Sequence, residues 1–384
     1  MKFQTIYANT TVIDSTVDFF IVTDHMSDAN FISQSQSLND CKKYFGKNTI
    51  IDLFSNQGLN FKDYFFIFDH YLNFEDFDGY FYPNYLLDTA IHYQKLNQKF
   101  FPNYTNDFTK KTHSVNCITN KVRPARLLVS CWFANNQVDK LLHSQSWTST
   151  DNHAMSLLDE LLQIGDLIDW THEFGPAVKM LEQQWIDSQH IDASQLLNNS
   201  TFGDNFFKST LNQIYKSTAI SVVLEPVFWE HGSIATEKYM QAVYGGTIPL
   251  VNGYKIYDSF TTLGFDTFSD IIDTSSQYER NPILRIWNML ESNKHVFSQW
   301  QDIISDPHVQ NRIDSNLILL KNPENIFKNS IKLNSKQSFN KMLSFRKNLD
   351  IKKSSKSELK NFLGHLSCGF QYLDLLDIPD KLNK

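Results

Sequence analysis

The fold is decided by the stretch AISVVLEPVFWEHGSIATEKYMQAVYGGTIPLVN, which runs from Ala219 to Asn252. The apolar runs Ile220 to Leu224 and Ile248 to Val251 predict two strands, and the spacing from Ile234 to Tyr244 predicts a helix between them. Two strands joined through one helix are normally parallel, with a right-handed crossover. Residues from Glu225 to Lys238 should therefore lie at the carboxyl end of a sheet, where open α/β folds bind their ligands.

The first hundred residues repeat this alternation of strands and helices. Strands are predicted over Val17 to Thr23, Thr49 to Phe54 and Tyr64 to Phe68, with helical stretches between them. Such alternation is typical of a parallel, wound sheet. We therefore expect an α/β fold with a first domain over residues 1–110.

The length of the chain favours more than one domain. At 384 residues it exceeds one ordinary core and suits two domains of roughly 150 to 200 residues each. The segment Lys99 to His113 loses hydrophobic periodicity and gains Pro, Asn, Thr and Lys, which indicates a boundary. We expect a second α/β domain over residues 111–325 and a basic helical segment over residues 326–384.

Composition excludes several classes of protein. The four cysteines lack the paired spacing of a zinc ribbon or a redox motif. No signal peptide is recognisable, and no run approaches 18 apolar residues, the length at which a bilayer span is predicted. We expect a soluble, cytoplasmic protein in a reducing compartment.

Charge is unevenly distributed along the chain. From Lys321 to Gly364 there are 11 Lys or Arg residues and 3 acidic residues, although the whole chain carries a net charge of −7. The segment Lys328 to Lys360 could contact an anionic surface, either lipid or nucleic acid. Alternatively, its helices pack back across the two domains.

The start of the helix in the opening stretch offers an anion site. Thr236 and Glu237 are capping-type residues, Lys238 adds a positive charge, and free backbone N–H groups at a helix start favour anions. An ordinary helix cap with an exposed Glu–Lys pair explains the same residues. The dinucleotide and P-loop glycine fingerprints are absent from the sequence.

Beyond these local patterns, the opening stretch resembles the donor-binding motif of α-1,3-fucosyltransferases and exostosin-type glycosyltransferases. Thr236-Glu237-Lys238, Ala242, Gly246 and Pro249 match that motif. Over Cys117 to Asp273 the chain also resembles phage and bacterial glycosyltransferase-like proteins. The resemblance implies a GT-B architecture, in which two Rossmann-like domains face a cleft and the second holds a nucleotide sugar. It also implies the cytoplasm of a bacterial or virus-infected host cell.

The same resemblance assigns roles at the donor site. Glu237 would bind the ribose, Lys238 the diphosphate, and Arg123 or Arg126 would add a second cation. Glu225, in the preceding acidic loop, is included in this predicted site. A metal-independent transfer needs such cations to stabilise charge on the departing diphosphate. The two arginines could instead form a basic surface turn.

An inverting transfer also needs a general base on the acceptor side. Two predicted strands end in Asp-His pairs, so we expect Asp69 or Asp24 in this role, with His70 beside it. Each of them could simply be a structural strand-end residue. Asp76 and Asp78 form a D-x-D pattern that could bind a metal ion, but this pattern does not end an apolar strand. We therefore expect no metal and no cofactor besides the donor.

Three functions are compatible with these patterns. The first is transfer of a sugar from a nucleotide sugar to a hydroxyl group of a glycan. The second is transfer to hydroxymethylated bases of phage DNA, in which the basic segment would hold the polyanion. The third is a non-catalytic module that binds nucleotides or glycans, because fold alone does not fix function.

Overall fold

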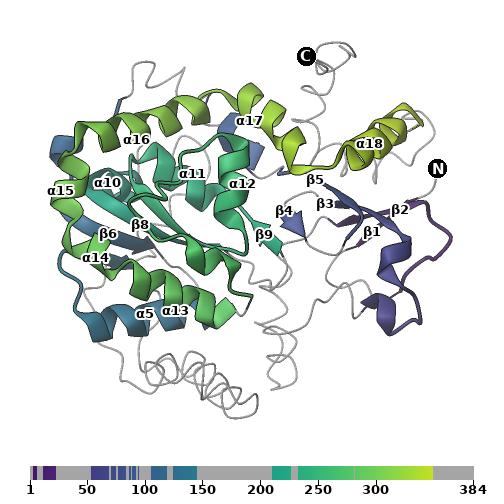
Figure 1. The fold of residues 1–384 in the computed structure, drawn as a ribbon, viewed down its shortest axis with the longest axis horizontal. Helices are drawn as coiled ribbons and strands as arrows, with labels where there is room; N and C mark the ends of the chain where they lie inside the picture. The colour runs from purple at the N-terminus through teal and green to yellow at the C-terminus, as the bar shows by residue number, and fades with distance from the viewer. Residues whose placement is uncertain are drawn as a thin grey trace.

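The chain forms a mixed α/β structure that contains two parallel sheets (Figure 1). The computed structural model describes the following residues: 3–6, 12–22, 53–68, 71–74, 77–83, 86–87, 89–91, 94, 105–118, 124–144, 210–225, 232–280 and 282–348. Within these residues, parallel strands alternate with helices, as a Rossmann-like arrangement requires. The expected α/β class is therefore confirmed, at this coarse level.

The first sheet has the strand order β1-β2-β3-β5, with all neighbours parallel. Its strands are β1 (Phe3–Ile6), β2 (Phe19–Val22), β3 (Phe65–Phe68) and β5 (Gly79–Phe81). The predicted strands at β2 and β3 are confirmed to within two residues at their ends. A short 3₁₀ helix, η1 (Phe61–Asp63), leads into β3.

The strand predicted over Thr49 to Phe54 is wrong at its described end, because residues 53–55 are helical. Phe54 is fully buried and packs edge-on against Phe20 and Phe66 of the sheet, with ring centroids 5.0 and 5.6 Å away. Phe54 is buried by lying against a face of the sheet, so it does not have to belong to a strand. A short apolar run in the sequence is compatible with a strand and with a helix that packs on the sheet.

The second sheet has the order β10-β8-β6-β7, again with all neighbours parallel. Its strands are β6 (His113–Ile118), β7 (Leu141–Ser144), β8 (Thr218–Leu224) and β10 (Ile248–Asn252). Three helices connect or precede them: α5 (Pro124–Asn136), α10 (Thr210–Ser217) and α11 (Glu237–Tyr244). Since β7 and β8 lie on opposite sides of β6, the strand order reverses between β6 and β8.

The predicted strand, helix, strand unit is confirmed, and β8 and β10 are parallel. Its helix begins at Glu237 and not at Ile234, because Ile234 belongs to a short strand, β9 (Gly232–Ile234). β9 pairs antiparallel with β4 (Tyr71–Phe74), and the two lie between the sheets in Figure 1. This ladder joins the segment after β3 to the segment that precedes α11.

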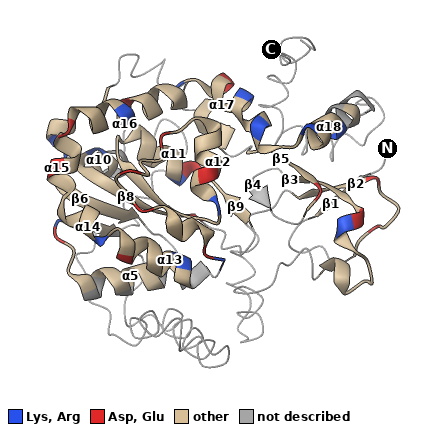
Figure 2. Cartoon of the chain, in the orientation of Figure 1, with Lys and Arg blue, Asp and Glu red and all other residues tan. Residues whose placement is uncertain are grey.

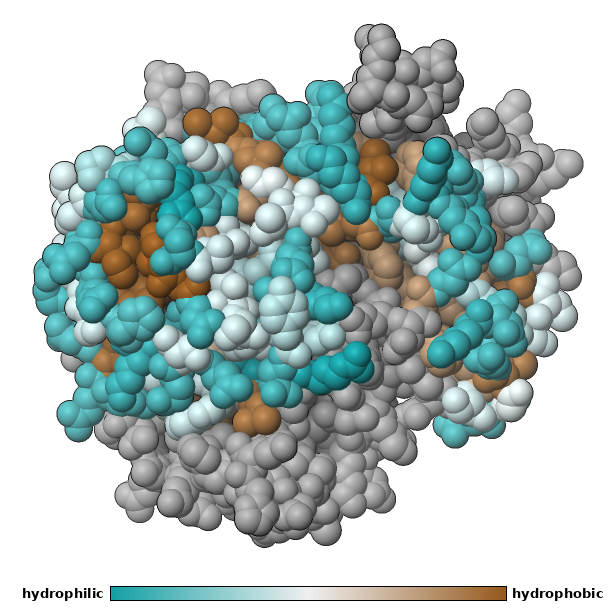
Figure 3. Space-filling view, in the orientation of Figure 1, coloured by the Kyte–Doolittle hydropathy of each residue, from teal (hydrophilic) through white to brown (hydrophobic). Residues whose placement is uncertain are grey.

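The C-terminal helices cover the second sheet and then reach the first. They are α12 (Ile256–Leu263), α13 (Pro282–Ser292), α14 (Lys294–Ser298), α15 (Trp300–Ser305), α16 (Pro307–Leu320), α17 (Pro323–Ser330) and α18 (Lys336–Asn348), with the 3₁₀ helices η3 (Ser275–Tyr278) and η4 (Ile331–Leu333). A further 3₁₀ helix, η2 (Phe108–Lys110), precedes β6. From this side they present mainly hydrophilic residues, with hydrophobic residues visible between α10, α14 and α15 (Figure 3).

Helices α17 and α18 carry basic residues (Figure 2), and two of these form ion pairs within the chain. Lys341 forms an ion pair with Asp78 at 2.5 Å and lies over the Phe65 ring, 4.9 Å from its centroid. Lys328 pairs with Glu324 at 2.6 Å. Asn334 bonds both backbone groups of Phe81 in β5. In its described part, the basic segment thus packs back onto the first sheet, and contact with an anionic surface stays a prediction.

The turn after α11 leaves no room for a side chain at Gly245. A Cβ added to Gly245 would lie 2.3 Å from Tyr215 Cβ, although the φ of Gly245, −73°, suits any residue. We expect Gly245→Ala to lower the free energy of unfolding by about 2 to 3 kcal/mol, as overpacking does. Urea unfolding measures it. For Gly58→Ala, where φ is +69° and no atom lies within 4 Å, we expect only about 1 kcal/mol of backbone strain. Equal losses of stability in Gly245→Ala and Gly58→Ala would contradict the predicted clash with Tyr215.

Candidate functional site

The candidate site lies at the carboxyl edge of the second sheet, beside the point where the strand order reverses. Strand β6 ends at Ile118 and β8 ends at Leu224, so Glu225 directly follows the reversal. Crevices outside the carboxyl ends of parallel strands at such a point are the usual ligand sites of open α/β sheets. The start of α11 opens at the same edge, because this helix leads from β8 to β10.

Glu225 connects the end of β8 to the start of α11. Its Oε1 accepts a hydrogen bond from the Thr236 backbone N–H at 3.0 Å, and its Oε2 accepts one from the Thr236 hydroxyl at 2.5 Å. Both residues are buried. Thr236 is the N-cap of α11, as predicted, and its Oγ1 accepts from the Lys238 N–H. Glu225 therefore holds the helix start against the strand end.

Glu237 and Lys238 form an ion pair next to this contact. Lys238 Nζ donates to Glu237 Oε1 at 3.1 Å and to Thr236 Oγ1 at 3.3 Å. The two side chains are only 14% and 23% exposed, so this is not the exposed pair of the alternative interpretation. An ammonium group has three N–H bonds, and the described residues accept two from Lys238. The third N–H of Lys238 has no acceptor among the described residues.

The two carboxyl groups of this cluster differ in proton affinity. Burial raises the pKa of Glu225 to about 7, against the opposing effects of Lys238 and Thr236. Burial also acts to raise the pKa of Glu237, but the charge and hydrogen bond of Lys238 outweigh it and lower that pKa. Below pH 7 the cluster therefore contains a neutral Glu225 beside the Glu237–Lys238 ion pair.

Arg126 does not lie in an exposed turn, which was the alternative interpretation of the two arginines. It lies in the first turn of α5 and is only 6% exposed. Burial raises the pKa of Cys117 in β6 to about 12, and the positive charge of Arg126 acts in the opposite direction. The guanidinium therefore lies close to β6, beside the reversal point. The two nearby arginines in the sequence could not distinguish a turn from a helix that starts at Pro124.

Four predicted residues, Asp24, Asp69, His70 and Arg123, lie outside the described residues. Their roles stay predictions. The described residues before them belong to β2 and β3, which are adjacent parallel strands that end at Val22 and Phe68, at the same edge of the first sheet. Tyr71, which follows His70 in the sequence, pairs with Ile234, two residues before Thr236.

Sequence reasoning missed a basic cluster after β10. Three cations lie over the ring of Tyr254: Lys255, Arg280 and Arg285 are 5.5, 5.8 and 6.0 Å from its centroid. Arg285 is 1% exposed, and its Nε donates to Asn252 Oδ1 at 3.3 Å. The Asn252 Nδ2 has no hydrogen-bond partner among the described residues. Lys255 could have been found from its place just after a predicted strand, but Arg285 comes from α13 and has no local signal.

No group of three or more His, Cys, Asp or Glu suited to a metal ion occurs in the described part of the chain. Of the D-x-D pattern, Asp78 is paired with Lys341, and Asp76 lies outside the described residues. Likewise, none of the described helices has the length and apolar character needed to cross a bilayer.

Comparison with known proteins adds no relative: no family model, no curated protein and no solved structure matches this chain. The function must therefore be inferred from the residues at the edge of the sheet.

The buried carboxyl of Glu225 predicts a pH-dependent stability. Its pKa rises from 4.5 to about 7 on folding, so between these values the folded protein keeps a proton that the unfolded chain has released. Stability conferred by this proton is complete below pH 4.5 and is lost as the pH rises to 7, by about 3 kcal/mol. Glu225→Gln does not titrate, so urea unfolding should show the variant gaining this amount over the wild type across the range. Glu324→Gln, an exposed control, should track the wild type. Parallel curves for Glu225→Gln and the wild type would contradict the prediction.

Proposed function

We propose that the protein is a glycosyltransferase of the two-domain GT-B type, which transfers a sugar from a nucleotide sugar to an acceptor hydroxyl with inversion and without a metal ion. The observation that carries the proposal is the cluster of Glu225, Thr236, Glu237 and Lys238 at the carboxyl edge of a parallel sheet. It combines a helix start, a carboxylate and a lysine whose third N–H has no acceptor in the described part of the chain, next to the reversal of the strand order.

The chemistry asked of this cluster is stabilisation of the leaving group. Charge develops on the nucleoside diphosphate as the glycosidic bond to it breaks, and fixed donors at that position lower the barrier. Lys238 would supply such a donor at the positive end of α11, although its own backbone N–H is bound to Thr236 Oγ1. Glu237 would accept from the ribose hydroxyls. The basic cluster over Tyr254 adds positive charge after the neighbouring strand. Arg123 or Arg126 remains the proposed second cation.

The acceptor side is proposed to supply the general base. Asp69 or Asp24 would take the proton of the acceptor hydroxyl, with His70 beside it. The β4–β9 ladder supports this arrangement, because it hydrogen-bonds the segment that follows Asp69 and His70 to the segment that precedes Thr236. Residues from both sheets would then meet across one site.

Thermal unfolding of the purified protein with nucleoside diphosphates tests the proposal. We expect one of GDP, UDP, CDP and dTDP to raise Tm by a few degrees at about 100 times its Kd. The corresponding nucleotide sugar should then be hydrolysed slowly or transferred. The same nucleotide should not shift Tm in Lys238→Ala, whereas it should in Lys332→Ala, a control at an exposed lysine. A protein that binds none of the four and turns over no nucleotide sugar would refute the proposal.

A further inference from the structure

The cluster at the start of α11 contains two carboxyl groups and one ammonium group among the described residues. Lys238 Nζ donates to Glu237 Oε1 at 3.1 Å. It connects to Glu225 through Thr236, whose Oγ1 lies 3.3 Å from Nζ and 2.5 Å from Glu225 Oε2. Glu225 is 4% exposed and the Glu237 side chain 14%. With both carboxyls ionised, two negative charges and one positive charge leave the cluster with an excess of one negative charge in a poorly solvated place.

The other groups that face Glu225 do not remove this excess. Burial raises the pKa of Tyr215 in α10, and the negative charges of the cluster add to the rise. Burial likewise raises the pKa of Cys117 in β6 to about 12, against the charge of Arg126 in α5. The phenol and the thiol are therefore neutral near pH 7. Of the charges that act on Glu225 in the described part of the chain, that of Lys238 alone favours the carboxylate.

Glu225 can take up a proton without losing its contacts. Its Oε1 accepts from the Thr236 backbone N–H at 3.0 Å in either charge state. At Oε2 the Thr236 hydroxyl donates to the carboxylate, and after protonation the carboxyl O–H donates to Thr236 Oγ1. Glu237 differs, because its protonation would give up the ion pair with Lys238. A proton that enters the cluster is therefore expected on Glu225.

A bound diphosphate would increase the excess of negative charge. Its oxygen would accept the third N–H of Lys238, whose side chain is 23% exposed and which has no acceptor for that N–H among the described residues. Phosphate oxygens at this position compete with Glu237 and Glu225 for the same positive charge. Like charges repel strongly in a poorly solvated site, and protonation of one carboxyl removes much of that repulsion.

We propose that Glu225 takes up one proton when a nucleotide sugar or a nucleoside diphosphate binds at Lys238. This coupling rests on the proposed function, and it makes Glu225 a positioning residue that acts through Thr236 and not by contact with the ligand. Burial holds the pKa of Glu225 at about 7 in the unliganded protein. At pH 6 the proton is therefore already bound, whereas at pH 8.5 it must be taken from solution. Donor affinity should thus fall as the pH rises above 7.

Isothermal titration calorimetry counts the proton. GDP, UDP, CDP and dTDP are titrated in turn into the purified protein at pH 8, in Tris and in HEPES buffer, whose enthalpies of ionisation differ. The second pKa of a phosphate group is about 6, so the terminal phosphate of the ligand stays ionised at this pH. For a nucleotide that binds, the difference between the two binding enthalpies should correspond to uptake of about 0.5 to 1 proton per ligand. This count is made on the wild type and needs no variant.

Glu225→Gln tests whether the proton is bound at this residue. The amide has the shape of the neutral acid and can keep both contacts with Thr236, so the variant should take up no proton. At pH 8.5 it should bind the nucleotide about tenfold more tightly than the wild type, and at pH 6 the two affinities should be equal. Glu324→Gln, a matched change at an exposed glutamate in α17, should behave like the wild type.

Three results would overturn the coupling. They are binding of a nucleotide to the wild type at pH 8 without proton uptake, proton uptake that persists in Glu225→Gln, and uptake that is lost in Glu237→Gln alone. In each case, nucleotide binding that disappears in Lys238→Ala would still support the proposed function. If none of the four nucleotides binds, the proposed function fails and the coupling fails with it.

Discussion

Replacing Lys238 with alanine is expected to lower kcat/KM for sugar transfer by about 10²- to 10³-fold, the usual effect of removing one donor from a preorganised anion site. Two of the N–H bonds of Lys238 are held by Glu237 and Thr236, so the ammonium is fixed in place before a ligand arrives. A donor fixed in this way needs no reorganisation when charge develops on the diphosphate. Steady-state kinetics with the nucleotide sugar identified by thermal shift measures the loss.

Two controls make this result interpretable. Lys238→Ala leaves Glu237 without its ion-pair partner at 14% exposure, so unfolding of the variant must be measured alongside its activity. Lys238→Arg keeps the charge and should recover part of the rate, whereas a purely structural residue would show loss of Tm and activity in parallel. Unchanged kcat/KM in a folded Lys238→Ala would remove Lys238 from the proposed site.

The same experiment separates catalysis from simple binding. A wild type that binds a nucleoside diphosphate through Lys238 but turns over no nucleotide sugar would be the non-catalytic module considered from the sequence. The geometry of the donor side alone cannot give turnover, because the general base must come from elsewhere. Substitutions of Asp24 and Asp69 should then lower kcat with little change in nucleotide affinity.

Local sequence patterns predict two of the four strands of the second sheet. The runs at β8 and β10 are apolar and bounded by turn residues, and each was located to within two residues at its ends. The start of α11 was predicted three residues too early, because Ile234 belongs to a strand that pairs with Tyr71, more than 160 positions earlier in the chain. A helical spacing of apolar residues does not show such a partner. The misassigned strand near Phe54 has the same cause, contact with distant residues.

The candidate site was predictable only in part. The T-E-K motif indicates a helix start, and its Thr236 is the cap that the structure contains. The contact between Glu225 and Thr236 depends on β8 and α11 meeting at one edge, which the sequence implies but does not fix. Arg285 and Lys111 were not predictable from local patterns. Arg285 comes from the distant helix α13, and Lys111 lies in the aperiodic segment that indicated only a domain boundary.

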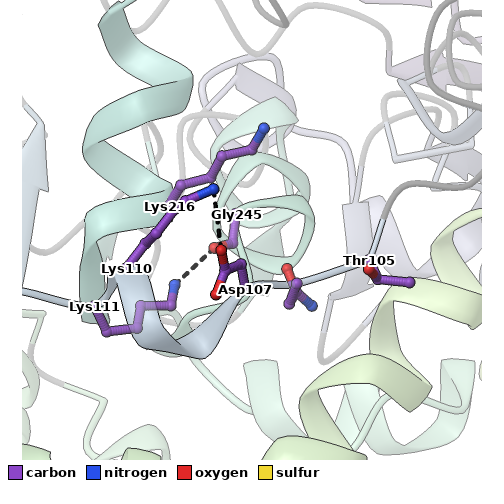
Figure 4. A pocket seen from close by; sticks show the side chains of 7 residues that line it. Thr105, Asp107, Lys110, Lys111, Lys216 and Gly245 are labelled. Atoms are coloured by element: carbon purple, nitrogen blue, oxygen red, sulfur yellow. Dashed lines mark hydrogen bonds and ion pairs between the residues drawn. The ribbon is translucent and has the colours of Figure 1, made fainter.

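Lys111 gives the second large prediction, a rise in stability with pH. Its pKa falls from 10.5 to about 7 on folding, so between these values the unfolded chain binds a proton that the folded protein has released. Stability therefore increases from pH 7 to pH 10.5, by up to about 5 kcal/mol relative to Lys111→Met, which cannot titrate. Lys111 Nζ donates to the carbonyl oxygens of Tyr215 at 3.2 Å and Gly245 at 2.8 Å, which favours the ammonium and makes this an upper limit. Lys216, Lys110 and Asp107 line the same small pocket as Lys111 (Figure 4), so the comparison must be made within one background.

Urea unfolding of the wild type and Lys111→Met from pH 7 to 10 measures the effect, with Lys332→Met as the exposed control. Curves that run parallel would show that Lys111 stays charged in the folded protein. Because Glu225 acts below pH 7 and Lys111 above it, their combined contribution has a minimum near neutrality. The two residues lie at opposite ends of α11, so their effects should add, and the double variant Glu225→Gln/Lys111→Met should lose both slopes.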